Sequence, residues 1–279
     1  MIKRWKMLPW NLWGRQAAAV VRLELQKNLF SRRAIWVYMM AAGAPLVALL
    51  HWVTARPGHC SLPGDAMAFA GMFEFYYLRL ALFLGCVGIF SNLTRGEMLE
   101  RTLHYYLLSP VRREVLILAK YLAGLVTATG LFALSVALTF LAIGAHFGVA
   151  WQDFVFHGAG GRQLGAYLLV TVLACVGYGA VFTVAGLVVR NPMIPAAVVW
   201  IWEAGNAFLP SLLKKLSVIF YLKSLSPVQA PVNGPLALLA TATDPTPAYL
   251  AIPGLLIVAA GLLALAARRA RSLEISYAE

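Results

Sequence analysis

Glu203 is the acidic residue whose place in the sequence most constrains what the chain can do. It lies inside an apolar run, Met193 to Leu213. A helix that begins at Met193 puts it about 15 Å along the axis, near the centre of a roughly 30 Å hydrocarbon core. A carboxylate at that depth must be paired, protonated or in contact with water. With Asn206 one turn further on, Glu203 forms either a polar strip that lines a water-filled path through the membrane or a structural hydrogen bond or ion pair within a helix bundle.

The segment 95–114 is the second place where charged residues gather, and it carries both signs of charge. Five of its residues follow a spacing of three or four and share one face of a short helix: Glu97, Glu100, Arg101, His104 and Leu108. Ser109 and Pro110 are the residue types that begin a helix, as N-cap and first residue. The segment is therefore expected to form a helical elbow, which is either a solvated loop helix or a docking surface for a cytosolic partner.

Motifs for catalysis and nucleotide binding are absent from the sequence. It contains no GxxxxGK[ST], HExxH or GxSxG, and no pair of carboxylates spaced for acid–base chemistry. The five histidines are scattered, and the three cysteines form no CxxC pair. We therefore expect no catalytic residue, no bound cofactor and no metal site in this chain.

The composition is that of an integral membrane protein. Of 279 residues, 61 % are hydrophobic and 12 % are charged, whereas a soluble domain is about half apolar and about a quarter charged. The mean hydropathy is +0.75. The net charge of +12 comes from basic residues that flank apolar runs, so it indicates membrane topology rather than a nucleic-acid partner.

The apolar runs predict an all-α membrane domain over residues 34–270 with six transmembrane helices. Residues 1–33, with Trp5, Trp10 and Trp13 among basic side chains, are expected to form an amphipathic helix on the membrane surface. In the second span, Arg79 is expected to extend towards the outer interface, with Glu74 as a candidate partner. The expected spans are 34–53, 75–94, 115–147, 163–189, 193–213 and 245–267.

The distribution of lysine and arginine predicts the orientation of these spans. If the N-terminus is inside, 17 of the 23 basic residues lie in inside segments and five lie in outside loops. This bias places both termini in the cytosol, including the tail 271–279. The segment 211–244 is then external, and we expect it to hold a short helix in the outer leaflet followed by irregular chain.

The segment 95–114 and its continuation to Lys120 resemble the signature of ABC-2 type transporter permeases. In that signature an acidic, Thr-Leu-containing stretch follows the second span, then Leu-Leu, a small residue, Pro, an aliphatic residue, a basic residue and a later Lys. Arg101 departs from it, because many members have Gly there. The matching residues are Glu97, Glu100, Thr102, Leu103, Leu107, Leu108, Pro110, Val111, Arg113 and Lys120.

The resemblance implies a transporter subunit that is not itself an enzyme. It would be the permease of an exporter in the plasma (inner) membrane of a prokaryote, paired with a second permease copy, identical or paralogous, and contacting membrane lipid. ATP and Mg²⁺ would bind to a separate ATP-binding cassette ATPase, and the substrate is not identified. The ATPase-coupling residues would be Glu97, Glu100, Arg101, Thr102, Leu103, His104, Leu108, Pro110 and Arg113. The alternatives are a lipid-modifying membrane enzyme and a non-transporting membrane anchor.

Overall fold

The computed structural model describes residues 10–31, 34–55, 60–96, 112–189, 191–214, 217–228 and 246–271. Within these ranges the regular elements are all helical and there is no strand. The α-helices are α1 (Trp10–Phe30), α2 (Ala34–Thr54), α3 (Leu62–Met72), α4 (Leu82–Ser91), α7 (Arg113–Ile143), α8 (Val149–Phe156), α9 (Gly160–Val188), α10 (Met193–Ala204), α11 (Ser211–Lys214), α12 (Val218–Leu225) and α13 (Ala248–Arg271). Four short segments of π or 3₁₀ geometry complete the description: η2 (Phe73–Ala81), η3 (Asn92–Gly96), η4 (Ala145–Phe147) and η5 (Gly205–Phe208).

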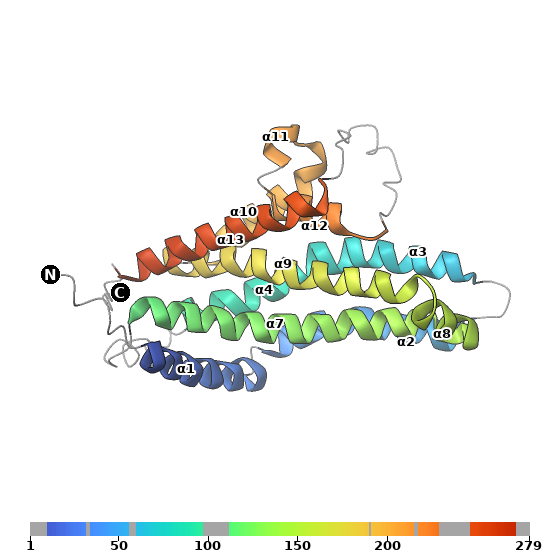
Figure 1. The fold of residues 1–279 in the computed structure, drawn as a ribbon, viewed down its shortest axis with the longest axis horizontal. Helices are drawn as coiled ribbons and strands as arrows, with labels where there is room; N and C mark the ends of the chain where they lie inside the picture. The colour runs from blue at the N-terminus through green and yellow to red at the C-terminus, as the bar shows by residue number, and fades with distance from the viewer. Residues whose placement is uncertain are drawn as a thin grey trace.

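The long helices form one elongated bundle (Figure 1). Helix α7 lies at its centre and packs against α1, α2 and α9, while α9 also packs against α4 and α13. The start of α7 and the end of α13 meet at the end of the bundle that α1 covers, which we call the α1 end. Helix α8 and the start of α3 lie at the opposite end, the α8 end.

Five helical stretches in the described residues are long and apolar enough to cross a membrane, which confirms the predicted class of the protein. Many large apolar side chains on their outer faces are exposed, as expected for helices that contact lipid. The five stretches are Ala34–Thr54, Leu62–Ser91, Arg113–Phe147, Gly160–Val188 and Ala248–Arg271.

The predicted fifth span, 193–213, is wrong as a single spanning helix. Helix α10 has 12 residues, which is about 18 Å of helix and too short to cross a bilayer alone. The backbone then tightens into η5 at Gly205, and Pro210 precedes a new short helix, α11. Glycine and proline are poor residues for a helix interior, which accounts for the break. Helix α11 stands out from the side of the bundle (Figure 1).

The second long stretch begins earlier than the sequence predicts, at Leu62 instead of 75. Ser61 is the N-cap of α3, and its Oγ accepts a hydrogen bond of 3.2 Å from the backbone N–H of Gly64. Pro63 stands in the first turn, where a missing N–H costs nothing. Much of the predicted outside loop is therefore helix, and α3, η2 and α4 run on without interruption.

Polar side chains inside the bundle bond to one another. The hydroxyl of Tyr77, in η2, lies 2.7 Å from both the Ser135 and the Thr139 hydroxyls of α7. Ser135 in turn donates to the backbone carbonyl of Ala41 in α2. Because a buried hydroxyl without a partner is costly, this chain of bonds fixes the register of three elements in the core.

Candidate functional site

Most of the predicted coupling residues lie outside the described residues. Arg113 is described, and it is exposed at the start of α7. The structure nevertheless describes both flanks of the segment 97–111, because η3 leads into it and α7 follows it. The predicted coupling residues outside the described ranges are Glu97, Glu100, Arg101, Thr102, Leu103, His104, Leu108 and Pro110.

Lys120 joins the two flanks to α1. Its Nζ donates to Glu24 Oε1 of α1 at 2.6 Å and to the backbone carbonyl of Leu93 in η3 at 3.2 Å. The Glu24 and Lys120 side chains are each 1 % exposed. A buried ion pair is sensitive to the loss of either partner, so this contact fixes where α1 lies against α7. We call the Glu24, Leu93 and Lys120 set the Lys120 junction.

The sequence brings these charges together through helical periodicity. Val20 and Glu24 are four residues apart on α1 and both are buried, as are Leu116 and Lys120 on α7. Val20 packs with Leu116 one turn from the ion pair. Of the helix predicted over residues 1–33, the described part is α1, and its face carrying Glu24 is turned to the bundle.

A second group of contacts surrounds the first turn of α7. The guanidinium of Arg112 lies 4.5 Å from the centre of the Trp13 ring of α1. Arg113 donates to the backbone carbonyl of Arg271 at 3.2 Å, and Arg271 forms an ion pair with Glu114. Helices α1 and α13 are therefore both attached to the first turn of α7, which follows the segment 97–111 in the sequence.

Beside the Lys120 junction lies a cavity of about 260 Å³ between α1, α2 and the end of α4. Polar groups of Asn28, Ser31 and Asn92 are among its walls. The Asn92 amide is held by a hydrogen bond of 2.6 Å to the carbonyl of Gly88. The cavity therefore lies next to the hydrogen bonds of Asn92 and Lys120 that hold η3 in place.

Glu203 lies at the end of α10, where its carboxylate accepts hydrogen bonds from the start of α12. Oε1 accepts from the backbone N–H of Val218 at 3.0 Å, and Oε2 accepts from that of Ile219 at 2.8 Å. Oε2 also accepts from the Ser217 hydroxyl at 2.9 Å and from the Tyr178 hydroxyl at 3.3 Å. A negative charge is favourable at a helix N-terminus, where backbone N–H groups lack helical partners.

The geometry around Glu203 supports the structural one of its two interpretations. Its side chain is buried and its four donors come from α9 and the start of α12. Asn206 is also buried, and its amide donates to the carbonyl of Lys214 at 3.4 Å. Both side chains therefore hold together the chain that replaces a continuous fifth span.

Glu203 also borders a largely apolar cavity of about 230 Å³ between η2, α9 and α10. Arg79 lines it too, and forms the predicted ion pair with Glu74, at 3.9 Å. Glu74 accepts a second cation, Lys223 of α12. The carboxylate of Glu74 thus links α12 to the second long stretch.

Comparison with models of known protein families shows to which family the chain belongs. The family model described as "ABC-2 family transporter protein" matches residues 20–204, about two thirds of the sequence. The chain belongs to this family. The chain is thus a multi-pass membrane component of a transporter, and the match runs from Val20 in α1 to Ala204 at the end of α10. A search of curated proteins gave no match.

Three residues of the ABC-2 protein's candidate sites were missed by sequence reasoning. Glu24 had a visible signal, since it is the single acidic residue among the first 33, at four-residue spacing from Val20. Tyr178 and Lys223 gave no such signal. Their roles depend on how α9 and α12 pack on α10 and η2, which spacing along the chain does not show.

Proposed function

We propose that the ABC-2 protein is the permease subunit of an ATP-driven exporter. ATP and Mg²⁺ would bind to a separate ATP-binding cassette ATPase, and transport would be coupled to hydrolysis through the segment 97–111. The Lys120 junction is the observation that carries this proposal, because it links both flanks of that segment to α1 and α7 by buried polar contacts. Export is the direction that the resemblance implies.

The segment 97–111 would form the contact with the ATPase. Arg112 and Arg113 support this placement, because they are exposed where the segment meets α7, at the α1 end. The acidic residues Glu97 and Glu100 would add charge of the opposite sign to the same surface. Such a mixed surface favours a specific, charge-complementary partner.

Glu203 and Asn206 would act on the substrate path by shaping it. Glu203 holds the start of α12 beside the apolar cavity, and Asn206 holds the turn that precedes it. The working complex would contain a second permease copy, identical or paralogous, in the plasma membrane of a prokaryote. Lipid would contact the exposed apolar faces of the long helices.

The proposal is tested by co-expressing the tagged chain with each ATP-binding cassette ATPase of its source genome and purifying the complex. We expect one ATPase to co-purify and to hydrolyse ATP faster in the complex than alone. Reversing Glu97 and Glu100 to Lys should weaken co-purification while the chain still inserts, because insertion depends on the spans.

Asp153→Lys is the matched control for the charge reversal. Asp153 is exposed on α8, at the end of the bundle opposite the start of α7. We expect this variant to keep both binding and hydrolysis. Full binding and hydrolysis in the Glu97→Lys, Glu100→Lys double variant would contradict the docking role of the segment.

A further inference from the structure

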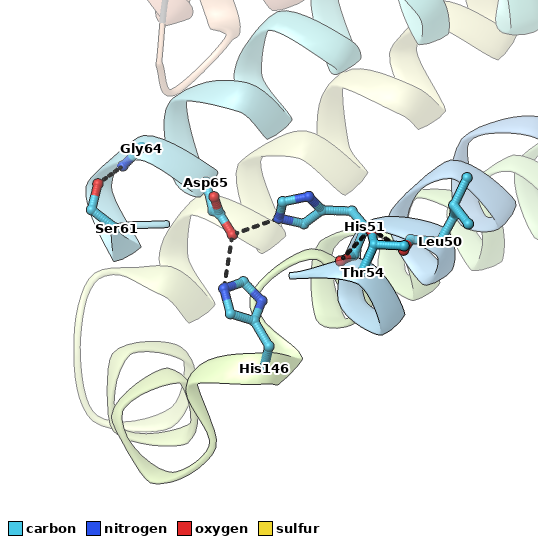
Figure 2. Close-up of polar contacts among 7 residues, drawn as sticks. All are labelled: Leu50, His51, Thr54, Ser61, Gly64, Asp65 and His146. Carbon is cyan, nitrogen blue, oxygen red and sulfur yellow. Dashed lines mark hydrogen bonds and ion pairs between the residues drawn. The ribbon is translucent and has the colours of Figure 1, made fainter. Parts of the chain in front are cut away.

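Four side chains with metal-binding chemistry meet at the α8 end of the bundle, far along the chain from one another. His51 is in the last turn of α2, Cys60 precedes α3, Asp65 is in the first turn of α3, and His146 is in η4. One ligand atom from each lies within 4.8 Å of the ligand atoms of the other three. Figure 2 shows the two imidazoles pointing at the Asp65 carboxylate from two sides.

The distances around Asp65 define the centre of this cluster. Oδ2 of Asp65 lies 3.1 Å from Nε2 of His51 and 3.5 Å from Nε2 of His146. The two rings meet edge to face, at 81° with centroids 5.4 Å apart, so they converge without stacking. Ligand atoms around a tetrahedral zinc ion lie about 3.3–3.8 Å apart, given bonds of about 2.0–2.3 Å. Small side-chain movements would bring the four atoms to that spacing.

His146 supplies an independent observation. Both of its ring nitrogens are buried, and within the described residues neither has a hydrogen-bond partner, although Nε2 lies 3.5 Å from the Asp65 carboxylate. Buried polar atoms normally have one, because leaving them without costs the energy of desolvation. A cation between His146 and Asp65 would bond to Nε2 and would account for an imidazole placed this way.

We propose that His51, Cys60, Asp65 and His146 bind a divalent transition-metal ion of the zinc class. Two imidazole nitrogens, a thiolate and a carboxylate are ligands that Zn²⁺ accepts, and four protein ligands make a closed, structural type of site. Cys60 distinguishes a metal site from a His–Asp–His cluster that is held together by hydrogen bonds alone. A thiol would add little to the hydrogen bonds of such a cluster.

The local fold fixes two of the four ligands, Asp65 and His146. Ser61 caps α3 and so sets the first turn that carries Asp65. On the other side, Gly148 has φ of +59°, a conformation that other residues rarely adopt, and it turns the chain from η4 into α8. A bound ion would join the ends of α2, α3 and α7 at the end of the bundle opposite the proposed ATPase contact.

The test uses the full-length chain in detergent, with an affinity tag that contains no histidine, after removal of metal by a chelator. Addition of Co²⁺ should give the intense visible absorption of tetrahedral cobalt and a thiolate-to-cobalt band in the near ultraviolet. Zn²⁺ should displace the cobalt and abolish both, and mass spectrometry of the metal should find one zinc ion per chain.

Variants then assign the ligands. Cys60→Ser should remove the thiolate band, and His51→Ala, Asp65→Asn and His146→Ala should each weaken Zn²⁺ binding by about tenfold or more. His157→Ala is the matched control, because this histidine is exposed at the same end of the bundle and lies outside the cluster. It should bind like the unchanged chain. The melting temperature of each metal-free variant shows whether it is folded. Of these substitutions, Cys60→Ser should disturb packing least, because Cys60 is only partly buried.

Three outcomes would overturn the proposal. The first is Zn²⁺ binding that His51→Ala and His146→Ala leave unchanged. The second is binding that depends on Cys60 and its sequence neighbour His59 alone, since such an ion would not need the ligands on α2, α3 and η4. Octahedral cobalt spectra with no thiolate band would likewise exclude the four-ligand site.

Discussion

Glu24 and Lys120 form an ion pair of 2.6 Å in which neither side chain is more than 1 % exposed. The two residues are 96 positions apart in the chain and connect α1 to α7. Lys120 is also the last residue of the sequence signature in which the chain resembles ABC-2 type permeases. The contact gives that residue a physical role next to the segment 97–111.

Removing one partner of this pair should destabilise the protein strongly. In Lys120→Met, Glu24 keeps its buried position without the cation, and such losses typically cost about 3–5 kcal/mol. We expect a clearly lowered melting temperature in detergent. Arg22→Met, at an exposed position of α1, the helix that carries Glu24, is the control and should melt like the unchanged chain.

The double variant Glu24→Leu, Lys120→Met separates charge from packing. Replacing both members of a buried pair by apolar residues is often close to neutral, because no charge is then left without its partner. We expect it to recover most of the stability lost in Lys120→Met. A double variant no more stable than the single one would show that the ion pair is not the source of the effect.

Glu203→Gln should lower the stability of the protein by about 1–3 kcal/mol, because an amide turns one acceptor into a donor that faces N–H or O–H groups. Tyr178→Phe removes only the longest of the four bonds to this carboxylate, at 3.3 Å, and should cost less. Thermal unfolding of both variants shows which of them loses more stability. Equal stability of Glu203→Gln and the unchanged chain would refute the role of Glu203 at the start of α12.

Two glycines of α7 should respond in opposite ways to alanine. A Cβ at Gly124 would lie 2.6 Å from the Leu93 side chain and 2.9 Å from that of Phe90, too close for either. Gly124→Ala should therefore lose about 1–3 kcal/mol. Gly130 has nothing within 4 Å of its Cβ position, so Gly130→Ala should gain up to about 1 kcal/mol from helix propensity. A lower melting temperature for both variants would contradict this account.

Cysteine labelling in intact cells tests the orientation predicted from charge. In a Cys60→Ser background, Asp153→Cys at the α8 end should react with an impermeant maleimide from outside. Gln26→Cys, on the exposed side of α1, should react only after the cells are opened. The reverse pattern would invert the topology.

Hydropathy was sufficient for the long helices and failed where a helix ends for local reasons. The run 193–213 is apolar enough to span, yet Gly205 and Pro210 divide it, and the break is stabilised by Glu203 bonding to α12. The start of α3 was missed for the converse reason. Pro63 was read as part of a loop, although after Ser61 it stands in the first turn of a helix.

Clusters formed across the bundle could not be predicted from spacing. The expectation of no metal site rested on the absence of ligands three or four residues apart, which holds for a site built on one helix. His51 and His146 belong to different helical ends, and only the packing of α2 and α3 on α7 brings them to one carboxylate. Residue spacing along the chain likewise does not predict that Glu24 and Lys120 form a pair.

The Lys120 junction has a mechanical consequence. A force applied to the segment 97–111 reaches η3 on one side and α7 on the other, and at a single ammonium group it also reaches α1. Arg271 attaches α13 to the same turn. The elements η3, α7, α1 and α13 would therefore move together as a rigid unit. A displacement at the α1 end would then shift several helices of the bundle at once instead of bending a single helix.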